Sequence, residues 1–589
     1  PVNLLTAMQF DRSLSTGGPD DLALAMRGMH DLSTPGFRTR HTLEQPTVTP
    51  ATRARLDCGV YPGGHMFNLQ KPSRAAFPAD GRKLPGGIKM MMRLALAALA
   101  LASPLPALGQ DDVAGQIAAL QIDRLRPLDF APFSDALSAF KPTPELDALI
   151  AGADIVAIQT AMADGSLTSE MLTLWHLARI QRLDDHLRGM MEINPAALAE
   201  AKAADARRAE GKSLGPMDGI PITLKDNIGT AGPMHTTANA EVLVDNIAPA
   251  DAPLVAKLRA AGAVIIGKAS LSEFAGALAA GFPSGGSGAV GGQGVNPLGP
   301  YPTYGSSSGS AISVSAGYAI ASIGTETSGS LVAPSAVMSL VAMKPSAGLV
   351  RGEGVVPLVL GNDGAGPVAR SVRDAALLLA AIDETDTDYA SGLSIGALDD
   401  VKVGILTAGI REASNYSQML ERAGAALAML GAEMHPVMLQ DTSGTLDAFV
   451  AYLSSGLRYD MMPYVTARHP ELVTPEDLIA YNAADPERRA PFGQGLITLI
   501  VPMSKDFTPG DHKEIGAEMR VAATGALDAA FAAKGAEVLV SIANLQAPFY
   551  ATAGYPAITV PTGRRDDGEP SGITLIGKKG QDAQLLAFA

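Results

Sequence analysis

The stretch from Tyr304 to Pro345 holds the densest set of residues that could do chemistry. Two runs rich in Gly and Ser, Gly305–Ser310 and Gly324–Ser330, flank a small, apolar segment with the composition of a buried helix or strand. Because glycine lets the backbone adopt positive φ and approach a ligand closely, such runs can aim several backbone N–H groups at one point. That arrangement stabilises a developing oxyanion. The continuous apolar sequence on both sides argues against the alternative, a flexible linker.

A base that could activate a serine lies upstream, at Lys225. This lysine ends the apolar, strand-like run Gly219–Leu224, so we expect its amine to be drawn into a low-dielectric interior. Burial disfavours the charged form, which lowers the pKa of a lysine and makes it a general base near neutral pH. A lone lysine after an apolar run more often keeps its charge in water at the surface. The Gly/Ser runs downstream favour the catalytic interpretation.

Taken together, the motifs resemble those of the amidase signature family. Three of them match in the family's order: GIPITLKDNI (219–228) resembles the lysine motif, YGSSSGSA (304–311) the GGSSGGS motif, and GTETSGSLVAPSA (324–336) the GTDTGGSIRxPA motif. The two matched serines, Ser306 and Ser330, lie 24 residues apart, as they do in family members. Flanking segments such as AGYPAITVPTG (553–563) also match. Within the family, the chain looks most like the bacterial peptide amidase and aryl acylamidase subgroup.

The resemblance implies a Ser–Ser–Lys relay that uses no metal and no cofactor. Ser330 would be the nucleophile, Ser306 the bridging serine held by a cis peptide bond, and Lys225 the base. Neutral Lys225 would take a proton from Ser306, Ser306 would take one from Ser330, and Ser330 would attack the carbonyl carbon. The expected oxyanion donors are the backbone N–H groups of Thr327, Ser328, Gly329 and Ser330.

Several positions depart from the family's motifs. Val332 replaces an Arg with which some members hold a carboxylate, and this argues against a small anionic substrate. Substrate contacts are expected at Val332, Gly305 and Ser307, and the Ser307 hydroxyl is expected to hydrogen-bond rather than to react. The milder departures are Glu326, Ser328 and Leu331, in place of Asp, Gly and Ile.

The elements that must position these residues alternate between helix and strand. Alternation of this kind indicates an α/β fold with helices on both faces of the sheet. The resemblance specifies it further, as a single large mixed β-sheet in an α/β/α sandwich. Helices are predicted within 145–210, where Thr168 or Ser169 can cap one of them, and at 252–261, 417–430 and 512–534; strands are predicted at 220–224, 264–266, 355–360 and 401–407.

Recognisable motifs become sparse across residues 400–546, the region expected to vary with substrate. Within it, Ala451–Gln494 is rich in Tyr and Met and has the character of a pocket wall or lid. Core packing is the commoner role of such residues, and both interpretations stay open.

The N-terminal part of the chain differs in charge from the rest. The first 109 residues contain 12 Lys and Arg against 7 Asp and Glu, whereas the whole 589-residue chain has a net charge of −15. Lys89–Arg93, a short apolar run and small residues up to Gly109 form the pattern of a secretory signal peptide, too short to span a membrane. We therefore interpret 1–89 as a disordered upstream segment foreign to the native protein, 90–109 as a signal peptide and 110–589 as the amidase domain.

Two rival motifs are weaker. Gly305–Gly309 fits G-x-S-x-G, which would make Ser307 the nucleophile, but the preceding Asn296–Thr303 is not strand-like. Gly286–Gly291 fits G-x-G-x-x-G, again without a strand before it, which argues against a dinucleotide site. No Cys/His cluster has the spacing of a zinc site, and the acidic balance argues against nucleic acid as a partner.

These observations predict an exported, periplasmic or secreted, hydrolase of small neutral amides. Peptide C-terminal amides and aryl amides are the first candidates, with carbamates and esters behind them. One alternative is a subunit that generates ammonia for tRNA-dependent transamidation, against which export argues because tRNA is cytosolic. Another is a catalytically silent binding protein with the same fold, which the joint presence of Lys225, Ser306 and Ser330 disfavours. The sequence indicates no stable membrane insertion and does not reveal an oligomeric state.

Overall fold

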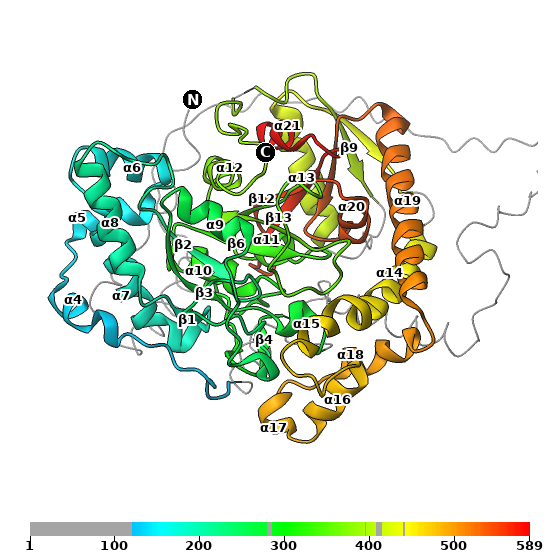
Figure 1. The fold of residues 1–589 in the computed structure, drawn as a ribbon. Coiled ribbons are helices and arrows are strands. Elements are labelled where there is room, and N and C mark those ends of the chain that lie inside the picture. Colours follow the sequence, from blue (N-terminus) through cyan, green and yellow to red (C-terminus); the bar gives the residue numbers. More distant parts are fainter. Residues whose placement is uncertain (1–120, 280–284, 395, 408–414, 440–441) are drawn as a thin grey trace, which may run out of the picture. The chain divides into compact units, whose positions relative to one another are not determined.

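A mixed β-sheet of 11 strands runs through the part of the chain that the structure describes (Figure 1). The structure, a computed structural model, describes residues 121–589 except 280–284, 395, 408–414 and 440–441. The predicted upstream segment and signal peptide, and the first residues of the predicted amidase domain, therefore lie outside the described residues.

The order of the strands across the sheet is β1-β3-β2-β6-β8-β7-β12-β13-β11-β9-β10. β2 is parallel to both of its neighbours, and so is β9, whereas the central pairings from β6 through β13 to β11 are antiparallel. The strands are β1 (Met190–Ile193), β2 (Pro221–Lys225), β3 (Val264–Ala269), β6 (Ala321–Glu326), β7 (Val341–Lys344), β8 (Gly364–Ala369), β9 (Lys402–Leu406), β10 (Glu433–Val437), β11 (Val538–Ile542), β12 (Ala557–Arg564) and β13 (Pro570–Ile576); a separate hairpin pairs β4 (Ser287–Gly288) with β5 (Gly292–Gln293).

Both faces of the sheet are buried, because successive strand residues point to opposite sides. On β3, Ile265 belongs to one apolar cluster and its neighbours Val264 and Ile266 to another. The first face is covered by α5 (Pro144–Gly152), α6 (Ile155–Ala163), α9 (Pro253–Ala260), α12 (Val372–Ala380), α13 (Asn415–Met429) and α21 (Asp582–Phe588). The second is covered by α8 (Ala197–Ala209), α10 (Ser308–Ser315), α11 (Val332–Ala336), α19 (Pro509–Lys534) and α20 (Ala547–Ala553). The predicted α/β fold with one large mixed sheet is confirmed.

A further group of helices lies away from the sheet, in yellow and orange in Figure 1. Its apolar cluster includes Tyr452, Met461 and Met462, so these residues of the predicted pocket wall pack in a core. The helices are α14 (Thr442–Gly456), α15 (Met462–Thr466), α16 (Pro475–Ala483), α17 (Pro486–Arg489) and α18 (Gly495–Ile500). The remaining helices are α4 (Ser134–Ala139), α7 (Ser169–Leu187) and the short helical turns η3 (Ala131–Phe133), η4 (Glu241–Leu243), η5 (Glu273–Gly276), η6 (Leu457–Met461) and η7 (Val501–Ser504).

Most predicted elements occur within a few residues of their predicted bounds, and Thr168 caps α7 by accepting a hydrogen bond from Met171 N. Two predictions are wrong. The stretch 145–210 contains a strand, β1, at the edge of the sheet between two helices. The apolar run 355–360 is a loop, because the N–H groups of Leu358 and Val359 donate to the Asp363 carboxylate instead of to a neighbouring strand.

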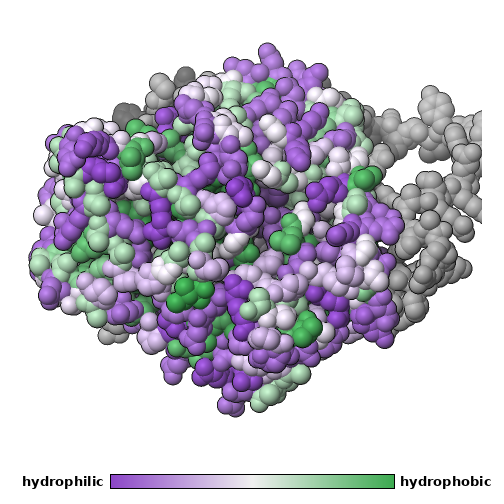
Figure 2. Space-filling model, in the orientation of Figure 1, coloured by the Kyte–Doolittle hydropathy of each residue, from purple (hydrophilic) through white to green (hydrophobic). Residues whose placement is uncertain are grey.

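Hydrophilic residues cover most of the face seen in Figure 2, and hydrophobic ones are scattered in small groups. Among the residues that the structure describes, none of the helices has the length and apolar character needed to cross a membrane.

Candidate active site

The side chain of Lys225 emerges at the end of β2, on the face of the sheet covered by α10. Ile222 and Leu224 point into the apolar cluster on the other face. Thr223 and Lys225 therefore point toward α10, and Thr223 Oγ1 lies 2.8 Å from Ser313 Oγ of that helix. The alternation of the strand thus delivers the amine to the Gly/Ser-rich segment.

The Lys225 amine is fully buried and surrounded by hydroxyl and carbonyl oxygens. Its Nζ donates to Ser306 Oγ at 2.7 Å and to Ser307 Oγ at 2.9 Å. It also contacts Thr325, at 2.8 Å from Oγ1 and 3.1 Å from the carbonyl oxygen. None of these partners is charged, so they do not compensate for the lost hydration of an ammonium group.

Burial accordingly lowers the pKa of Lys225 to about 7. The nearby carboxylates of Asp363 and Glu326 oppose this shift by favouring the charged form. A lysine with this pKa is divided between its neutral and protonated forms at neutral pH. The neutral form can accept a proton from a serine hydroxyl.

Ser306 follows a cis peptide bond, which joins it to Gly305. The Ser306 side chain is almost fully buried, and its carbonyl oxygen accepts a hydrogen bond from Ser272 N at 3.1 Å. A side chain at position 305 would collide with Ser272 Oγ, which explains the glycine there. Close packing at Gly305 and the hydrogen bond to the Ser306 carbonyl oxygen thus position the residue whose hydroxyl contacts Lys225.

Ser307 links the three motifs to one another. Its Oγ donates to Thr325 O at 2.8 Å, and its backbone N–H donates to Ser330 O at 3.1 Å. The Ser307 hydroxyl is completely buried and contacts Lys225, so it hydrogen-bonds within the site, and its contact with a substrate stays a prediction.

Ser330 lies at the end of a short loop, Thr327–Ser330, between β6 and α11. Its side chain is mostly buried, with 8% of the residue exposed. None of the four backbone N–H groups of this loop donates to another residue within the described ranges. Gly329 adopts a φ of +82°, and a Cβ there would meet Asn544, so the loop and Asn544 are in close contact. A loop with four free donors can bind an oxyanion.

Two carboxylates hold the two ends of this loop. Asp363 Oδ1 accepts a hydrogen bond from Thr327 Oγ1 at 2.5 Å. Glu326 Oε2 accepts hydrogen bonds from Leu331 N at 2.8 Å and Val332 N at 3.3 Å. Burial raises the pKa of Asp363 to about 6, so the carboxylate is ionised at neutral pH.

The structure thus brings Lys225, Ser306 and the Thr327–Ser330 loop into one site. Hydrogen bonds connect the lysine to Ser306, and Ser307 to the backbone of Ser330. Among the described residues, no hydrogen bond joins the hydroxyls of Ser306 and Ser330. The second step of the predicted relay therefore requires these two hydroxyls to come into hydrogen-bonding contact.

Of the predicted substrate contacts, Val332 is completely buried among apolar residues that include Leu406 and Tyr550. Its role in substrate binding stays a prediction.

Sequence reasoning missed Thr325 and Asp363. Thr325 lies inside a recognised motif, whereas nothing in the local sequence connects Asp363 to a loop 36 residues away.

Comparison with known proteins identifies the family. The sequence profile of the family described as Amidase matches residues 171–490, which include Lys225, Ser306 and Ser330. The chain belongs to the amidase family. The predicted resemblance is therefore confirmed, and the chain is a hydrolase of amides.

Relatives agree over most of the chain. A probable amidase of Arabidopsis thaliana is 33% identical over 463 residues, which are 74% of this amidase and 88% of the plant protein. One component of the glutamyl-tRNA(Gln) amidotransferase of a Synechococcus species is 29% identical over 478 residues, 74% of this chain and 94% of that protein. The crystal structure of the native peptide amidase from Stenotrophomonas maltophilia superposes with a TM-score of 0.68 at 34% identity, covering 74% of this chain and 96% of that one.

Among the residues that the structure describes, no group of three or more His, Cys, Asp and Glu side chains is arranged to hold a metal ion.

Proposed function

We propose that this amidase hydrolyses neutral carboxamides through an acyl-enzyme on Ser330, with Ser306 and Lys225 as the proton relay. The observation that carries the proposal is the contact of 2.7 Å between Ser306 Oγ and a buried lysine whose pKa is about 7. An amine with an ordinary pKa near 10.4 would be protonated at neutral pH and could not act as a base.

The reaction runs in two halves. Ser330 Oγ attacks the carbonyl carbon while its proton passes to Ser306 and the Ser306 proton passes to Lys225. The free N–H groups of Thr327–Ser330 stabilise the oxyanion, and loss of one such donor typically costs about 3 to 4 kcal/mol. The relay then runs in reverse, protonates the leaving amine, and water releases the acyl group from Ser330.

A neutral substrate fits the charge around the site. Asp363 and Glu326 are buried carboxylates that accept hydrogen bonds at the two ends of the loop Thr327–Ser330, here called the oxyanion loop. An anionic substrate group placed beside this loop therefore meets negative charge. The family position where an Arg would hold a carboxylate is Val332, fully buried among apolar residues. Similarity to the peptide amidase of Stenotrophomonas maltophilia supports peptide C-terminal amides as the first substrate class.

Similarity to glutamyl-tRNA(Gln) amidotransferase components supports a second candidate, release of ammonia from glutamine. The signal-peptide pattern at 90–109 supports export and favours the first candidate, because tRNA-dependent transamidation is cytosolic.

A panel of substrates tests the proposal: a peptide C-terminal amide, an acyl anilide, an aryl carbamate, an aryl ester and free glutamine. We expect release from the amides by the wild type, and a loss of about 10⁴-fold or more in kcat for Ser330→Ala. Circular dichroism establishes that the variant is folded. Turnover of glutamine alone would favour the amidotransferase-type role. Turnover of the amides by a folded Ser330→Ala variant at the wild-type rate would show that Ser330 is not the nucleophile.

A further inference from the structure

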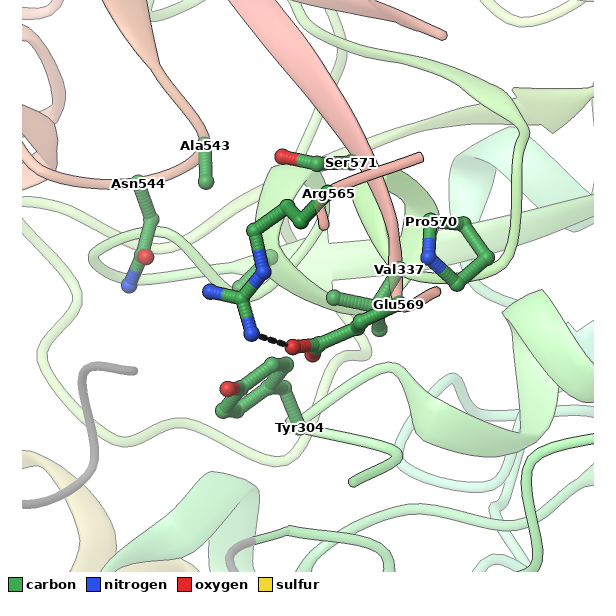
Figure 3. A pocket seen from close by; sticks show the side chains of 9 residues that line it. Tyr304, Val337, Ala543, Asn544, Arg565, Glu569, Pro570 and Ser571 are labelled. Carbon is green, nitrogen blue, oxygen red and sulfur yellow. Dashed lines mark hydrogen bonds and ion pairs between the residues drawn. The ribbon is translucent and has the colours of Figure 1, made fainter. Parts of the chain in front are cut away.

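A pocket lies next to the oxyanion loop, and the charged side chains of Arg565 and Glu569 are among those that line it (Figure 3). Three of its lining residues adjoin the candidate active site. Tyr304 directly precedes Gly305 and Ser306, Ala333 N donates to Gly329 O at 2.9 Å, and Asn544 contacts Gly329. The remaining lining residues are Val337, Ala543, Arg565, Glu569, Pro570 and Ser571.

These charged side chains belong to the turn that connects β12 to β13. The backbone N–H of Arg565 donates to Glu569 O at 2.8 Å, and this hydrogen bond closes the turn. The Arg565 guanidinium forms an ion pair with Glu569 Oε2, drawn as a dashed line in Figure 3, and a second one at 3.0 Å with Asp567 Oδ2. The side chains of Arg565 and Glu569 are only 8% and 6% exposed.

Glu569 Oε1 is buried, and no donor from the described residues reaches it. A buried carboxylate oxygen without a hydrogen bond is destabilising, because its lost hydration is not replaced. Because the pocket lies beside a candidate nucleophile, an N–H or O–H group of the substrate could donate a hydrogen bond to Glu569 Oε1.

The position of the pocket indicates which part of the substrate supplies that donor. Tyr304 and Ala333 flank the segments that carry Ser306 and Ser330, and the oxyanion loop lies against Asn544. A carbonyl group held by this loop has its acyl substituent or its leaving group beside the pocket. In primary amides the leaving group is ammonia, which is too small to extend into the pocket. The acyl part is therefore the group that reaches it.

We propose that Glu569 is a specificity-determining residue that accepts a hydrogen bond from a nitrogen on the acyl part of the substrate. This inference rests on the proposed function. The shared chemistry is an N–H donor near the scissile carbonyl, either the neutral N–H of a peptide or the protonated amine of an amino-acid amide. The pocket therefore selects substrates derived from amino acids over plain carboxamides.

Three amides with the same side chain test the proposal: N-acetylphenylalaninamide, phenylalaninamide and 3-phenylpropanamide, which lacks the nitrogen. We expect the wild type to prefer at least one nitrogen-bearing amide over 3-phenylpropanamide by about tenfold or more in kcat/KM, the worth of a hydrogen bond to a charged acceptor. Whichever of the two is preferred identifies the neutral or the charged donor. If the wild type does not discriminate, the inference is wrong.

Glu569→Gln sharpens the test. Because Arg565 needs an acceptor, the Gln carbonyl turns to the guanidinium and its NH₂ group faces the pocket, where a donor now meets a donor. The preference should fall to about twofold or less, with the rate on 3-phenylpropanamide unchanged within about twofold. Glu353→Gln is the matched control, since Glu353 also pairs with an arginine, Arg351, but is exposed. Equal losses on all three amides in Glu569→Gln would indicate a structural role and overturn the inference. Failure of the wild type on all three would instead refute the proposed function.

Discussion

Ser330 and Ser455 belong to two clusters that each contain a candidate base, but their surroundings differ. Ser455 Oγ lies 2.7 Å from His512 Nδ1, and His512 Nε2 lies 3.2 Å from Asp460 Oδ2. These are the residue types of the Ser-His-Asp triad of many hydrolases. Ser330 instead shares its site with a lysine and a second serine, a less familiar combination.

The two clusters differ in the solvent exposure of the serine and in the presence of free backbone N–H groups beside it. Ser455 is completely buried inside α14, and its hydroxyl donates to Tyr452 O at 2.9 Å, so its proton is directed away from the imidazole. The Tyr452 ring stacks on His512, with ring centroids 5.0 Å apart. Ser330 is 8% exposed and lies at the end of a loop whose N–H groups have no acceptor among the described residues. Residue types alone would favour the Ser455 cluster, whereas a partly exposed hydroxyl beside unpaired N–H donors favours Ser330 as the hydrolytic site.

The largest expected difference between the clusters concerns their bases. Lys225→Met keeps the length of the side chain but removes proton acceptance, and should lower kcat by about 10²- to 10⁴-fold. His512→Gln keeps a polar partner for Ser455 and should leave kcat within about twofold, while lowering the free energy of unfolding by about 1 to 2 kcal/mol. Steady-state kinetics and thermal denaturation of both variants measure this. A comparable loss of kcat in a folded His512→Gln variant would contradict the choice of the Ser330 cluster over the Ser455 cluster as the active site.

The dependence of activity on pH gives the next largest effect. Lys225 must be neutral to accept a proton, and its pKa is about 7. Below that pH the amine is protonated, so kcat/KM should fall about tenfold for each pH unit, and above it kcat/KM should reach a plateau. The profile should be recorded between pH 5 and 9 with a neutral amide, so that the substrate itself does not titrate. Activity that stays constant down to pH 5 would contradict lysine as the base.

Much of this site could be predicted from short stretches of sequence. Lys225 ends an apolar run, and alternation along a strand is enough to predict its burial. Ser306, Ser330 and the loop N–H groups lie within two glycine-rich runs whose spacing matches the family. These features depend on residues close together in the chain, where composition and period are informative.

The residues that sequence reasoning missed act through contacts between distant segments. Asp363 accepts a hydrogen bond from Thr327, which lies 36 residues earlier in the chain. It also accepts hydrogen bonds from Leu358 N and Val359 N, so the run 355–360, predicted as a strand, forms a loop. Glu569 reaches the site from the turn after β12, more than 200 residues beyond Ser330. Ser455 and His512 show the converse: their proximity is invisible in the sequence, and the complete burial of Ser455 argues against a catalytic role. Local sequence patterns predict the helices and strands, but they do not predict which side chains of distant elements come into contact.

Asp363 offers the finest test of the comparison, because it affects Lys225 through charge and the oxyanion loop through a hydrogen bond. With a pKa of about 6 it is ionised where Lys225 titrates, and its charge favours the protonated amine. Asp363→Asn removes that charge, yet its amide can still accept from Leu358 N and Val359 N and donate to Thr327 Oγ1. The midpoint of the pH profile should therefore move to lower pH, raising kcat/KM at pH 6 relative to its plateau by about threefold.

Thr327→Val is the matched control, because it removes the hydrogen bond and leaves the charge. It should lower the plateau of kcat/KM by loosening the loop, at an unchanged midpoint. If both variants lowered the plateau and neither moved the midpoint, Asp363 would act on the loop alone, and the pKa of Lys225 would not depend on the charge of Asp363. A shift in Asp363→Asn only would show that the site of Ser330 differs from that of Ser455 in one more respect: the pKa of its base is tuned by the charge of a neighbouring carboxylate.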